Sequence, residues 1–380
     1  MNASVVPEFA IPPMFLDAST PVFFDDGLDT WNVFAYRDVA RVLKNYDEFG
    51  MEYGDPDVHP SYGAMWFRDP PRHTDLRALT DDTFHLAAIR ELTSTVERVV
   101  DGLLDKVAPA GRADILTDLA QPLPALVICE ILGLDYAESL KFLGWLQEEH
   151  HLLTLGDFSG KPEMMAALAD LLRDRRDSGR PGVINDLLTA HAAGYLVDGR
   201  PLSERDLLGY VYMLLSASFG ATTTAIGNYL LAIVQHDLWK QLRDEPALIP
   251  GAVEESLRWD TPMPALRSQA KVDMSIGGQH VGAGQFVTGW MSAANRDSHE
   301  FDQPDVFDIH RRPNRHLAFG RGVHYCLGAE LGRLEMRILT EQFLRRVSPP
   351  IGLDPAAPAR RTFGLLHGVA EGTLVFPPTT

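Results

Sequence analysis

The spacing of apolar residues along the chain predicts a mostly helical protein. Residues 84–107 and 112–133 carry apolar side chains three and four positions apart, which places them on one face of a helix. The stretch 207–234 repeats this pattern over a greater length. Ser203 and Asp206 stand just before it, three residues apart, as in a capping box with Asp in place of the usual Glu or Gln. We therefore expect an unusually long helix to begin at this cap.

Predicted strands are few and short. The best candidates are the segments 30–36, 274–290 and 372–377, and the second of them contains a Gly-Gly pair at 277–278 that is typical of a hairpin turn. The sequence shows no internal repeat and no flexible linker between domains. We therefore predict a mainly α-helical fold with a small β region, in a single domain.

The composition narrows the classes of function. The chain has 380 residues, of which 45% are hydrophobic and 23% charged, as is usual for a globular protein. Its formal net charge of -18 argues against a nucleic-acid partner, because a phosphate backbone repels an acidic surface. No segment has the pattern of a signal peptide or a membrane span, and two cysteines do not make a disulfide framework. We expect a cytoplasmic protein with no nucleic-acid or membrane partner.

The two cysteines lie in different settings. Cys129 stands in an apolar segment and fits a buried, unreactive side chain. Cys326 is surrounded by Gly320, Gly322 and Gly328, and a predicted helix begins near residue 327. The N-terminus of that helix would point at the sulfur, where its free N–H groups and dipole favour a thiolate over a thiol.

A thiolate at Cys326 has three candidate roles. As a nucleophile it needs a general base, and His324 is a candidate for that base. As a zinc ligand it needs two or three further Cys or His ligands, but the sequence has no C-x-x-C motif. As the axial ligand of haem iron it needs no other protein ligand, because the porphyrin supplies the other four. The glycines would then leave room for the flat macrocycle.

The segment FGRGVHYCLG, residues 319–328, resembles the haem-binding loop of the cytochrome P450 family. It matches the pattern Phe-Gly-x-Gly-x-His-x-Cys-x-Gly at every defining position. The resemblance implies that Cys326 is the proximal ligand of the iron of haem b, followed in the loop by Gly328. It also implies that Phe319 packs beside the sulfur and that His324 meets a haem propionate. The implied protein has the P450 fold and is a haem-thiolate monooxygenase.

Two further segments carry the same resemblance to haem-binding parts of the family. His73 and Arg77, within residues 69–85, match the family's propionate-binding helix, and Arg267 matches a third propionate contact. The assignment is physically reasonable, because buried carboxylates need cationic or hydrogen-bonding partners. The resemblance is closest to the soluble bacterial type and extends over nearly the whole chain from about residue 30.

Other matched positions are structural. Glu255 and Arg258 match the family's Glu-x-x-Arg pair, which would join Arg311 in a network behind the haem. The resemblance thus makes residues 1–380 one P450 domain. Within it, the segment 1–29 is short and divergent, so we expect the family's usual first helix to be reduced.

The long helix departs from the family pattern. The family has small-Gly-x-acid-Thr where this chain reads ASFGATT, and no acid is present. An alignment without gaps places Gly220 at the acid and Ala221 at the catalytic Thr, with Thr222 at the second Thr. Sliding by one residue would place Thr222 at the catalytic Thr. A shift of one residue turns a helix by about 100°. The two alignments can therefore both be correct only if the helix contains a local bulge.

The missing carboxylate changes what we expect of the reaction. The small residues Ala217 and Ser218, together with Gly220 and Ala221, are expected to loosen the helix near the iron. Through water, a substrate hydroxyl or Thr222, protons would then reach the O2 that the haem iron activates. A second interpretation is that the enzyme catalyses oxidative coupling of aromatic or peptide groups, or uses peroxide.

The substrate pocket is expected to be largely apolar. The candidate lining residues are Met65, Ala217, Met263, Leu266, Leu365 and Leu366. Polar anchors would come from Tyr53, His59, Tyr62 and His367. The sequence therefore predicts a small or medium-sized, largely apolar organic substrate, or a peptide, in secondary metabolism or catabolism.

The chain has no flavin or iron–sulfur motif of its own, so electrons are expected from a ferredoxin and its reductase. Arg312, Arg315 and Arg321 lie close to Cys326 in the sequence and would form a basic docking face for an acidic ferredoxin. We expect a monomer that uses O2. A haem-binding sensor without turnover and a hydrolase with a cysteine nucleophile are the other hypotheses.

Overall fold

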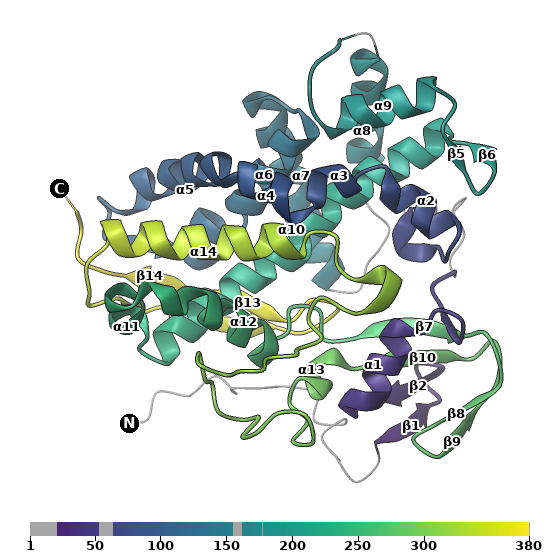
Figure 1. The fold of residues 1–380 in the computed structure, drawn as a ribbon. Helices are drawn as coiled ribbons and strands as arrows, with labels where there is room; N and C mark the ends of the chain where they lie inside the picture. The colour runs from purple at the N-terminus through teal and green to yellow at the C-terminus, as the bar shows by residue number, and fades with distance from the viewer. Residues whose placement is uncertain (1–20, 53–63, 155–161, 177, 380) are drawn as a thin grey trace.

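The computed structural model describes residues 21–52, 64–154, 162–176 and 178–379, and most of this chain is helical (Figure 1). The α-helices are α1 Tyr36–Lys44, α2 Arg72–Ala78, α3 Asp81–Phe84, α4 Leu86–Glu91, α5 Thr93–Val107, α6 Pro122–Leu132, α7 Tyr136–Thr154, α8 Pro162–Arg175, α9 Val183–Ala192, α10 Glu204–Gln235, α11 Trp239–Asp244, α12 Ile249–Trp259, α13 Met291–Ala294 and α14 Ala329–Arg346. Short helical segments of other types are η3 Met65–Phe67, η4 Ile115–Ala120, η5 Pro246–Leu248 and η6 Gly322–His324.

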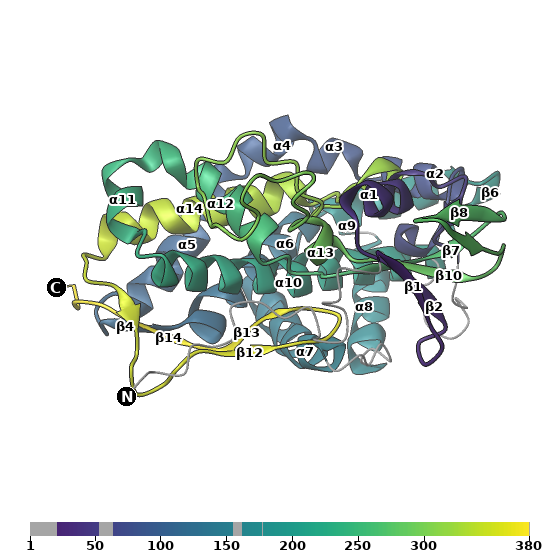
Figure 2. The same ribbon diagram turned by 90° about the horizontal axis from the view of Figure 1, so that it is seen from below.

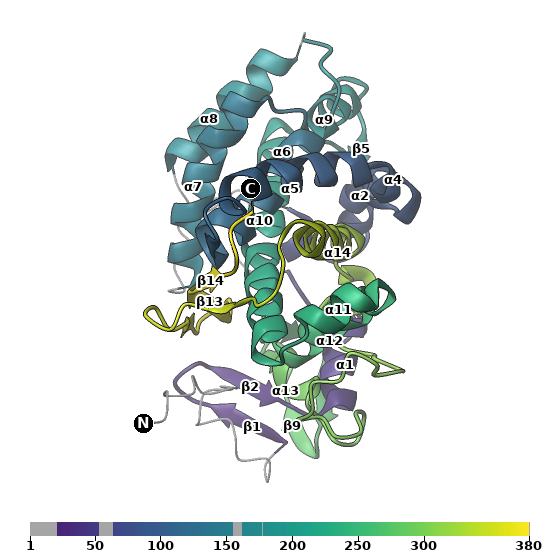
Figure 3. The ribbon, with the colours of Figure 1, turned by 90° about the vertical axis from the view of Figure 1, so that its left-hand side faces the viewer.

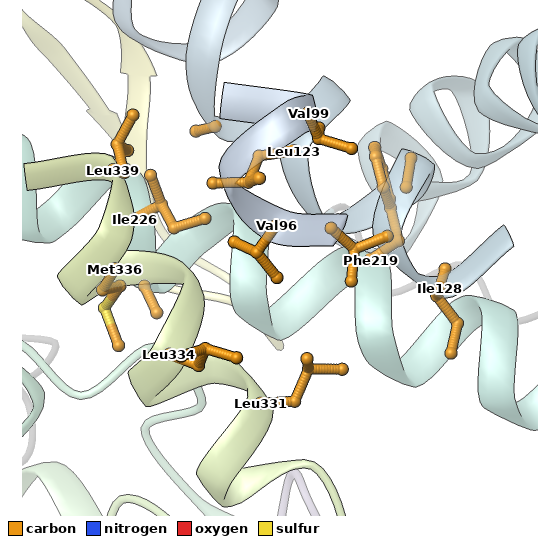
Figure 4. Close-up of a cluster of buried hydrophobic side chains, with 14 of the residues drawn as sticks. Val96, Val99, Leu123, Ile128, Phe219, Ile226, Leu331, Leu334, Met336 and Leu339 are labelled. Atoms are coloured by element: carbon orange, nitrogen blue, oxygen red, sulfur yellow. The ribbon is translucent and has the colours of Figure 1, made fainter. Parts of the chain in front are cut away.

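The long helix α10 runs through the centre of the molecule. Figure 3 shows it between α6 and α12, and it contacts both. Side chains from four helices meet around it in one core, including Val96 of α5, Ile128 of α6, Phe219 of α10 and Leu339 of α14 (Figure 4). Burial of these apolar side chains is the main favourable term that holds the helices together.

The strands form one larger sheet and several small ones. They are β1 Val22–Asp25, β2 Thr30–Val33, β3 Phe49–Gly50, β4 Arg112–Asp114, β5 Leu196–Val197, β6 Arg200–Pro201, β7 Leu266–Ala270, β8 Met274–Ile276, β9 Gln279–Val281, β10 Phe286–Gly289, β11 Gly352–Leu353, β12 Arg360–Thr362, β13 Gly368–Glu371 and β14 Thr373–Val375. The five-stranded sheet has the order β1-β2-β10-β7-β3, and its β2–β10 pair is parallel while the others are antiparallel. In Figure 2 the strands β12 and β13 lie along α10, and β13 contacts that helix.

The five-stranded sheet has a hydrophobic core of its own. Val33 of β2 and Val287 of β10 pack with Val39 and Val42 of α1 on one face of the sheet. This second core lies at the lower right of Figure 1, apart from the helical core around α10. The cysteine loop, residues 316–328, lies between α1 and α14, because η6 contacts α1 and the loop continues into α14.

Several sequence predictions are confirmed. The structure has the mainly helical fold with a small β region that the pattern predicted. Ser203 and Asp206 form the capping box of α10, with the Asp206 amide donating to Ser203 Oγ and Ser203 N–H donating to the Asp206 carboxylate. Gly277 and Gly278 have φ angles of 55° and 81° in the β8–β9 hairpin, as the Gly-Gly pair suggested.

Other predictions need correction or lie outside the described residues. The expected helix 112–133 begins as strand β4, where Ala113 pairs with Leu374 of β14, and continues as η4 and α6. A short apolar run does not distinguish a strand from a helix, so the pattern alone misassigned it. Of the short segment 1–29, residues 1–20 lie outside the described chain, and the rest contributes β1.

Two helical stretches are long and apolar enough to cross a membrane. They are residues 115–132 and α10, and the apolar windows are 78% and 72% buried inside the protein. Both belong to the helical core, which explains their apolarity without a membrane.

Candidate active site

The cysteine loop takes its shape from two glycines. Gly320 and Gly322 have φ angles of 66° and 73°, which other residues rarely adopt. At Gly322 a Cβ atom would also lie 2.8 Å from the carbonyl oxygen of Lys44, so only glycine fits. The loop closes where the Cys326 amide donates to the Phe319 carbonyl at 2.9 Å. These constraints hold the cysteine in one place.

The side chain of Cys326 is solvent-accessible, yet desolvation by the surrounding protein raises the pKa of its thiol. The N–H of Gly328 and the cations Arg77 and Arg333 lower this pKa only in part. α14 begins at Ala329, two residues later than expected. Desolvation outweighs the favourable contacts at this helix start, so the protein alone does not favour the predicted thiolate. A bound metal cation would complete the ionisation.

The surroundings of Cys326 fit a metal whose other ligands are not protein side chains. In the described ranges, no group of three or more His, Cys, Asp or Glu side chains is placed to hold a metal ion. Haem iron needs only one axial protein ligand. Cys129, by contrast, is fully buried in the helical core, and burial raises the pKa of its thiol to about 12, as expected of an unreactive cysteine.

Two of the predicted propionate contacts meet beside the cysteine loop. The rings of His73, on α2, and His324 lie edge to face with centroids 4.4 Å apart. His73 Nδ1 and His324 Nε2 are buried and have no hydrogen-bond partner among the residues that the structure describes. The Asp69 carboxylate is 3.7 Å from His324 Nε2, which is too far for a hydrogen bond. Two unpaired buried nitrogens at one place fit a ligand that brings its own carboxylates, as haem does.

The charge state of His73 also suits an anionic ligand. Burial, together with the nearby charges of His324 and Arg77, lowers the pKa of His73 to about 4, although the Asp69 carboxylate opposes the shift. The ring is therefore neutral near pH 7. A carboxylate at this place would supply the missing hydrogen-bond acceptor and oppose the shift.

The other two predicted propionate contacts are engaged elsewhere. Arg77 donates to the carbonyl of Tyr325 at 2.7 Å, and so connects α2 to the cysteine loop. Arg267, on β7, donates to the carbonyl of Asp29 at 3.2 Å and stacks on the ring of Phe286 at 3.8 Å. These contacts direct Arg267 to the β1–β2 turn and not to the histidine pair.

The central helix presents one open face. From Gly209 to Ile233 every residue of α10 is buried except Ala217, Ser218, Ala221 and Thr222. These positions are spaced i, i+1, i+4 and i+5, so they share one side of the helix. We call these four residues the open stripe. It contains only small side chains and hydroxyl groups, and no carboxylate.

The open stripe contains the residues that both alignments place at the catalytic Thr of the small-Gly-x-acid-Thr pattern. Ala221 and Thr222 both lie on it, about 100° apart, so each side chain reaches the open side without a bulge. Gly220, placed at the acid by the alignment without gaps, is buried off the stripe, and its carbonyl accepts the Thr224 hydroxyl at 3.0 Å. α10 continues unbroken through this region, so the expected loosening of the helix is not present.

The predicted structural network is assembled behind the cysteine loop. Glu255 and Arg258 are fully buried and form a bidentate pair, with nitrogen–oxygen distances of 2.8 Å. Arg311 Nε lies 3.2 Å from both Glu255 oxygens. The same carboxylate accepts the Asp308 amide and the Asn314 side chain, at 2.8 and 3.1 Å. A buried carboxylate with this many donors holds α12 to the chain before the cysteine loop.

A second carboxylate, which the sequence interpretation missed, supports the loop from the side of α14. Glu254 accepts from Arg333 at 2.7 Å and is 3.1 Å from His316 Nε2. Arg333 also lies over the ring of Phe319, at 4.4 Å. Desolvation would raise the pKa of Glu254, but the hydrogen bonds from His316 and Arg333 lower it to about 2. Glu254 directly precedes the recognised Glu255, and no pattern in the sequence separates the two roles.

The predicted pocket residues are spread over four parts of the chain. Ala217 lies on the open stripe. Met263 and Leu266 flank the second core at the start of β7, and Leu365 is half-buried in the β12–β13 loop. Met65 and Leu366 are buried. Met65 accepts a weak hydrogen bond from Tyr210 at 3.8 Å within the helical core, so it is a packing residue here.

The polar anchors are only partly described. Tyr53, His59 and Tyr62 lie outside the described residues. His367 is buried, 3.7 Å from Asp260, and burial lowers its pKa to about 4.

The predicted basic face is smaller than expected. Arg312 and Arg315 are exposed, and Arg315 lies 3.9 Å from Glu300. Arg321 donates to the hydroxyl of Tyr36 at 2.6 Å and so is tied to α1. Two of the three arginines therefore remain on the surface.

Comparison with known proteins gives one consistent family. A family model described as Cytochrome P450 matches residues 241–354. Putative cytochrome P450 YjiB of Bacillus subtilis is 34% identical over 331 residues, which cover 84% of this chain and 82% of that protein.

Solved structures agree over nearly the whole chain. The hydroxylase HmtN, a post-tailoring enzyme of himastatin biosynthesis, is 32% identical with a TM-score of 0.85, and the match covers 94% of each chain. CYP109E1 from Bacillus megaterium, in complex with testosterone, is 28% identical with a TM-score of 0.86, over 94% of this chain and 95% of that one.

Proposed function

From the premise that this chain belongs to the cytochrome P450 family, we propose which residues serve its reaction, what substrate it oxidises and how it receives electrons. As a member of the family it is a monooxygenase, and its cofactor is haem b. When bound, the haem supplies the iron chemistry that activates O2 for oxidation of an organic substrate.

Cys326 is the proposed iron ligand, and His73, Arg77 and His324 are the proposed partners of the haem carboxylates. The observation that carries this proposal is the pair of buried, unpaired histidine nitrogens beside the cysteine loop. Arg77 sits within the same group through its bond to the loop. Arg267 would join it by leaving the ring of Phe286.

The open stripe is the proposed distal surface. Ala217 and Ala221 leave room for substrate and oxygen, because they project only a methyl group. Ser218 and Thr222 have no side-chain hydrogen-bond partner among the described residues, so their hydroxyls are available to hold a water molecule and pass a proton. Thr222 is therefore the proposed proton-relay residue.

The proposed substrate is a small or medium-sized, largely apolar organic molecule of secondary metabolism. The open stripe carries no charge, and the candidate pocket residues Met263, Leu266 and Leu365 are partly buried apolar side chains. HmtN is an enzyme of himastatin biosynthesis, and CYP109E1 was solved with testosterone. Both similarities support this class.

A spectral titration of the ferric protein tests the substrate proposal. Terpenes, steroids, macrolides, aromatic amino acids and short tyrosine-containing peptides would be added separately. A low-to-high-spin shift with an apolar class supports the proposal, and Ala217→Phe should abolish that shift by filling the open stripe. A shift with none but charged compounds would contradict it.

A second candidate reaction is oxidative coupling or peroxide-driven oxidation. The observation in its favour is that the open stripe has no carboxylate for proton delivery. Analysis of the product separates the two reactions, since a monooxygenation product contains one oxygen atom from O2 and a coupled product contains none. Turnover with peroxide that exceeds turnover with NADPH and ferredoxin would favour the peroxide route.

Electrons are proposed to come from a separate ferredoxin through its reductase. Arg312 and Arg315 are exposed shortly before the cysteine loop and would attract an acidic partner, although the whole chain is acidic. The test is NADPH oxidation with a surrogate acidic ferredoxin and its reductase. Transfer that does not weaken with salt would argue against this docking face.

A further inference from the structure

A charged cavity lies beside α2, where four segments meet. Its volume is about 360 Å³, and its lining residues are Glu52, Arg68, Arg72, Asp198, Arg200, Arg205 and Asp206. They come from the chain just after β3, from the segment that joins η3 to α2 and the start of α2, from the β5–β6 hairpin and from the first turn of α10. Figure 1 shows α2 beside β5 and β6 at the upper right, and α2 contacts β5. The lining has four arginines and three carboxylates on a chain whose net charge is -18.

The carboxylates of the cavity do not neutralise all four guanidinium groups. Asp206 binds Arg72 at 2.5 Å through one oxygen, and its other oxygen accepts the capping-box bonds of Ser203. Glu52 and Asp198 are exposed, so water screens their charges. The carboxylates therefore compensate Arg72 more fully than they compensate Arg68 and Arg200.

Arg68 is the least satisfied of these cations. It is half-buried, and its side chain has no hydrogen bond, ion pair or ring contact with any described residue. Burial lowers the pKa of Arg68, and the positive charge of Arg72 lowers it further. Arg200 is exposed and likewise has no side-chain partner in the described chain. The carboxylates of Glu52 and Asp206 oppose the lowering of the Arg68 pKa through space but accept no hydrogen bond from Arg68, so its N–H groups remain available to an anion.

We propose that this cavity is a binding site for a small phosphate monoester, whose phosphate binds Arg68 and Arg200. A guanidinium group matches the phosphate oxygens in a bidentate manner, and a phosphate monoester carries close to two negative charges. The cavity is larger than a phosphate group, within the size range of small-ligand pockets. Its remaining carboxylates, Glu52 and Asp198, would accept hydrogen bonds from hydroxyl groups of the same ligand.

The test is isothermal titration of the haem-loaded protein at constant ionic strength. The probes are inorganic phosphate and glycerol 3-phosphate, with acetate as the carboxylate comparison. Arg68→Met and Arg200→Met should each weaken phosphate binding at least about tenfold, because each removes charge-assisted hydrogen bonds. Arg37→Met is the matched control, since Arg37 is exposed on α1 and lines no part of the cavity. It should bind phosphate as the unaltered protein does.

Three results would overturn the proposal. They are the absence of saturable binding, an equal loss of binding in Arg37→Met, and acetate binding as tight as phosphate. Stronger binding of glycerol 3-phosphate than of inorganic phosphate supports a monoester ligand. The reverse order would identify free phosphate as the ligand and overturn the assignment of a monoester.

Thermal unfolding distinguishes a ligand site from a structural arginine. Without phosphate, Arg68→Met should melt no lower than the unaltered protein, because it removes a half-buried cation that is repelled by Arg72 and has no hydrogen-bond partner among the described residues. With phosphate, the unaltered protein and Arg37→Met should gain equally in melting temperature, and Arg68→Met should gain less. A lower melting temperature of Arg68→Met without phosphate would mean that Arg68 has a structural role. Neither readout involves turnover, so failure here leaves the proposed oxidation reaction untouched.

Discussion

At the scale of single residues, two carboxylates outside the cysteine loop connect the elements that surround it. Glu255 accepts hydrogen bonds from Arg258, Arg311 and Asn314. Glu254 accepts from Arg333 and so connects α12 to α14. Both carboxylates are satisfied by several donors, which is the condition under which a buried charge stabilises a fold. The position of Cys326 therefore rests on neighbours that do not touch it.

Glu254→Gln should destabilise the protein by about 1–3 kcal/mol, which is less than for a fully buried pair because water reaches both partners. The side chains of Glu254 and Arg333 are 30% and 26% exposed. Urea unfolding measures the change. Glu330→Gln is the matched control, since Glu330 binds the same Arg333 at 2.9 Å but is 40% exposed. Equal losses in the two variants would contradict the role given to Glu254.

The contribution of Glu254 should depend on pH in one direction. Its pKa in the folded protein, about 2, lies below the ordinary value of 4.5. The stabilisation is therefore complete above about pH 4.5 and is lost as the pH falls from there toward 2. Unfolding free energies of the unaltered protein and Glu254→Gln, measured at several pH values, should converge on acidification. A difference that stays constant down to pH 2.5 would contradict the assignment.

Single residues were predicted from the sequence only where a motif marked them. Cys326, His73 and His324 were found because their spacing matched a pattern, and the structure brings the two histidines together. Glu254 was missed, because a side chain that acts through packing leaves no spacing signal. The orientation of Arg267 was also out of reach, since the ring of Phe286 comes from a strand distant in sequence.

At the scale of elements, α10 combines structural and chemical roles on different faces. Its cap and length were predictable from Ser203, Asp206 and the apolar period. Its open stripe was not, because exposure depends on which helices pack around it. Ala221 and Thr222 both lie on the stripe, so the structure allows either residue at the position of the catalytic Thr.

Replacement of a hydroxyl group on α10 should change the yield of product per NADPH only if the hydroxyl lies on the open stripe. Thr222→Val should lower the product formed per NADPH consumed several-fold, because it removes the proposed proton relay. Thr223→Val is the matched control: the Thr223 hydroxyl is buried without a hydrogen-bond partner in the described chain. That variant should keep its coupling and gain up to about 1 kcal/mol in stability. Equal uncoupling in both variants would remove Thr222 from the relay.

Ala221→Thr provides the opposite change on the same stripe. An added hydroxyl beside Thr222 should raise the product formed per NADPH if proton delivery limits the reaction. Substrate titration controls for a narrowed pocket. An unchanged yield of product per NADPH, with unchanged substrate binding, would mean that proton delivery is not limiting. That result would favour the oxidative coupling or peroxide reaction.

At the scale of the whole molecule, the fold class was predictable and the docking face only partly so. The helical core, the small β region and the hairpin at Gly277 and Gly278 follow from the patterns of the sequence. The basic face does not, because Arg321 is taken up by Tyr36 and only Arg312 and Arg315 remain exposed. Sequence proximity to the cysteine does not reveal which arginines find partners inside the fold.

Charge reversal at this face should weaken electron transfer from an acidic ferredoxin. The double variant Arg312→Glu and Arg315→Glu should raise the KM for ferredoxin several-fold and reduce the effect of salt, with substrate binding unchanged. Arg173→Glu is the control, since Arg173 is 68% exposed on α8, a helix on the far side of α10 from the cysteine loop. An equal rise in both would show that net charge, and not this face, governs the encounter.

The most direct measurement is the absorption spectrum of the reduced, CO-bound protein, with and without Cys326. The unaltered protein and Cys129→Ala should both show the long-wavelength Soret band of a thiolate-ligated haem. Cys326→His should bind haem but lose that band, because the nitrogen ligand replaces the thiolate. Retention of the band in Cys326→His, or its loss in Cys129→Ala, would contradict the assignment of Cys326 as the iron ligand.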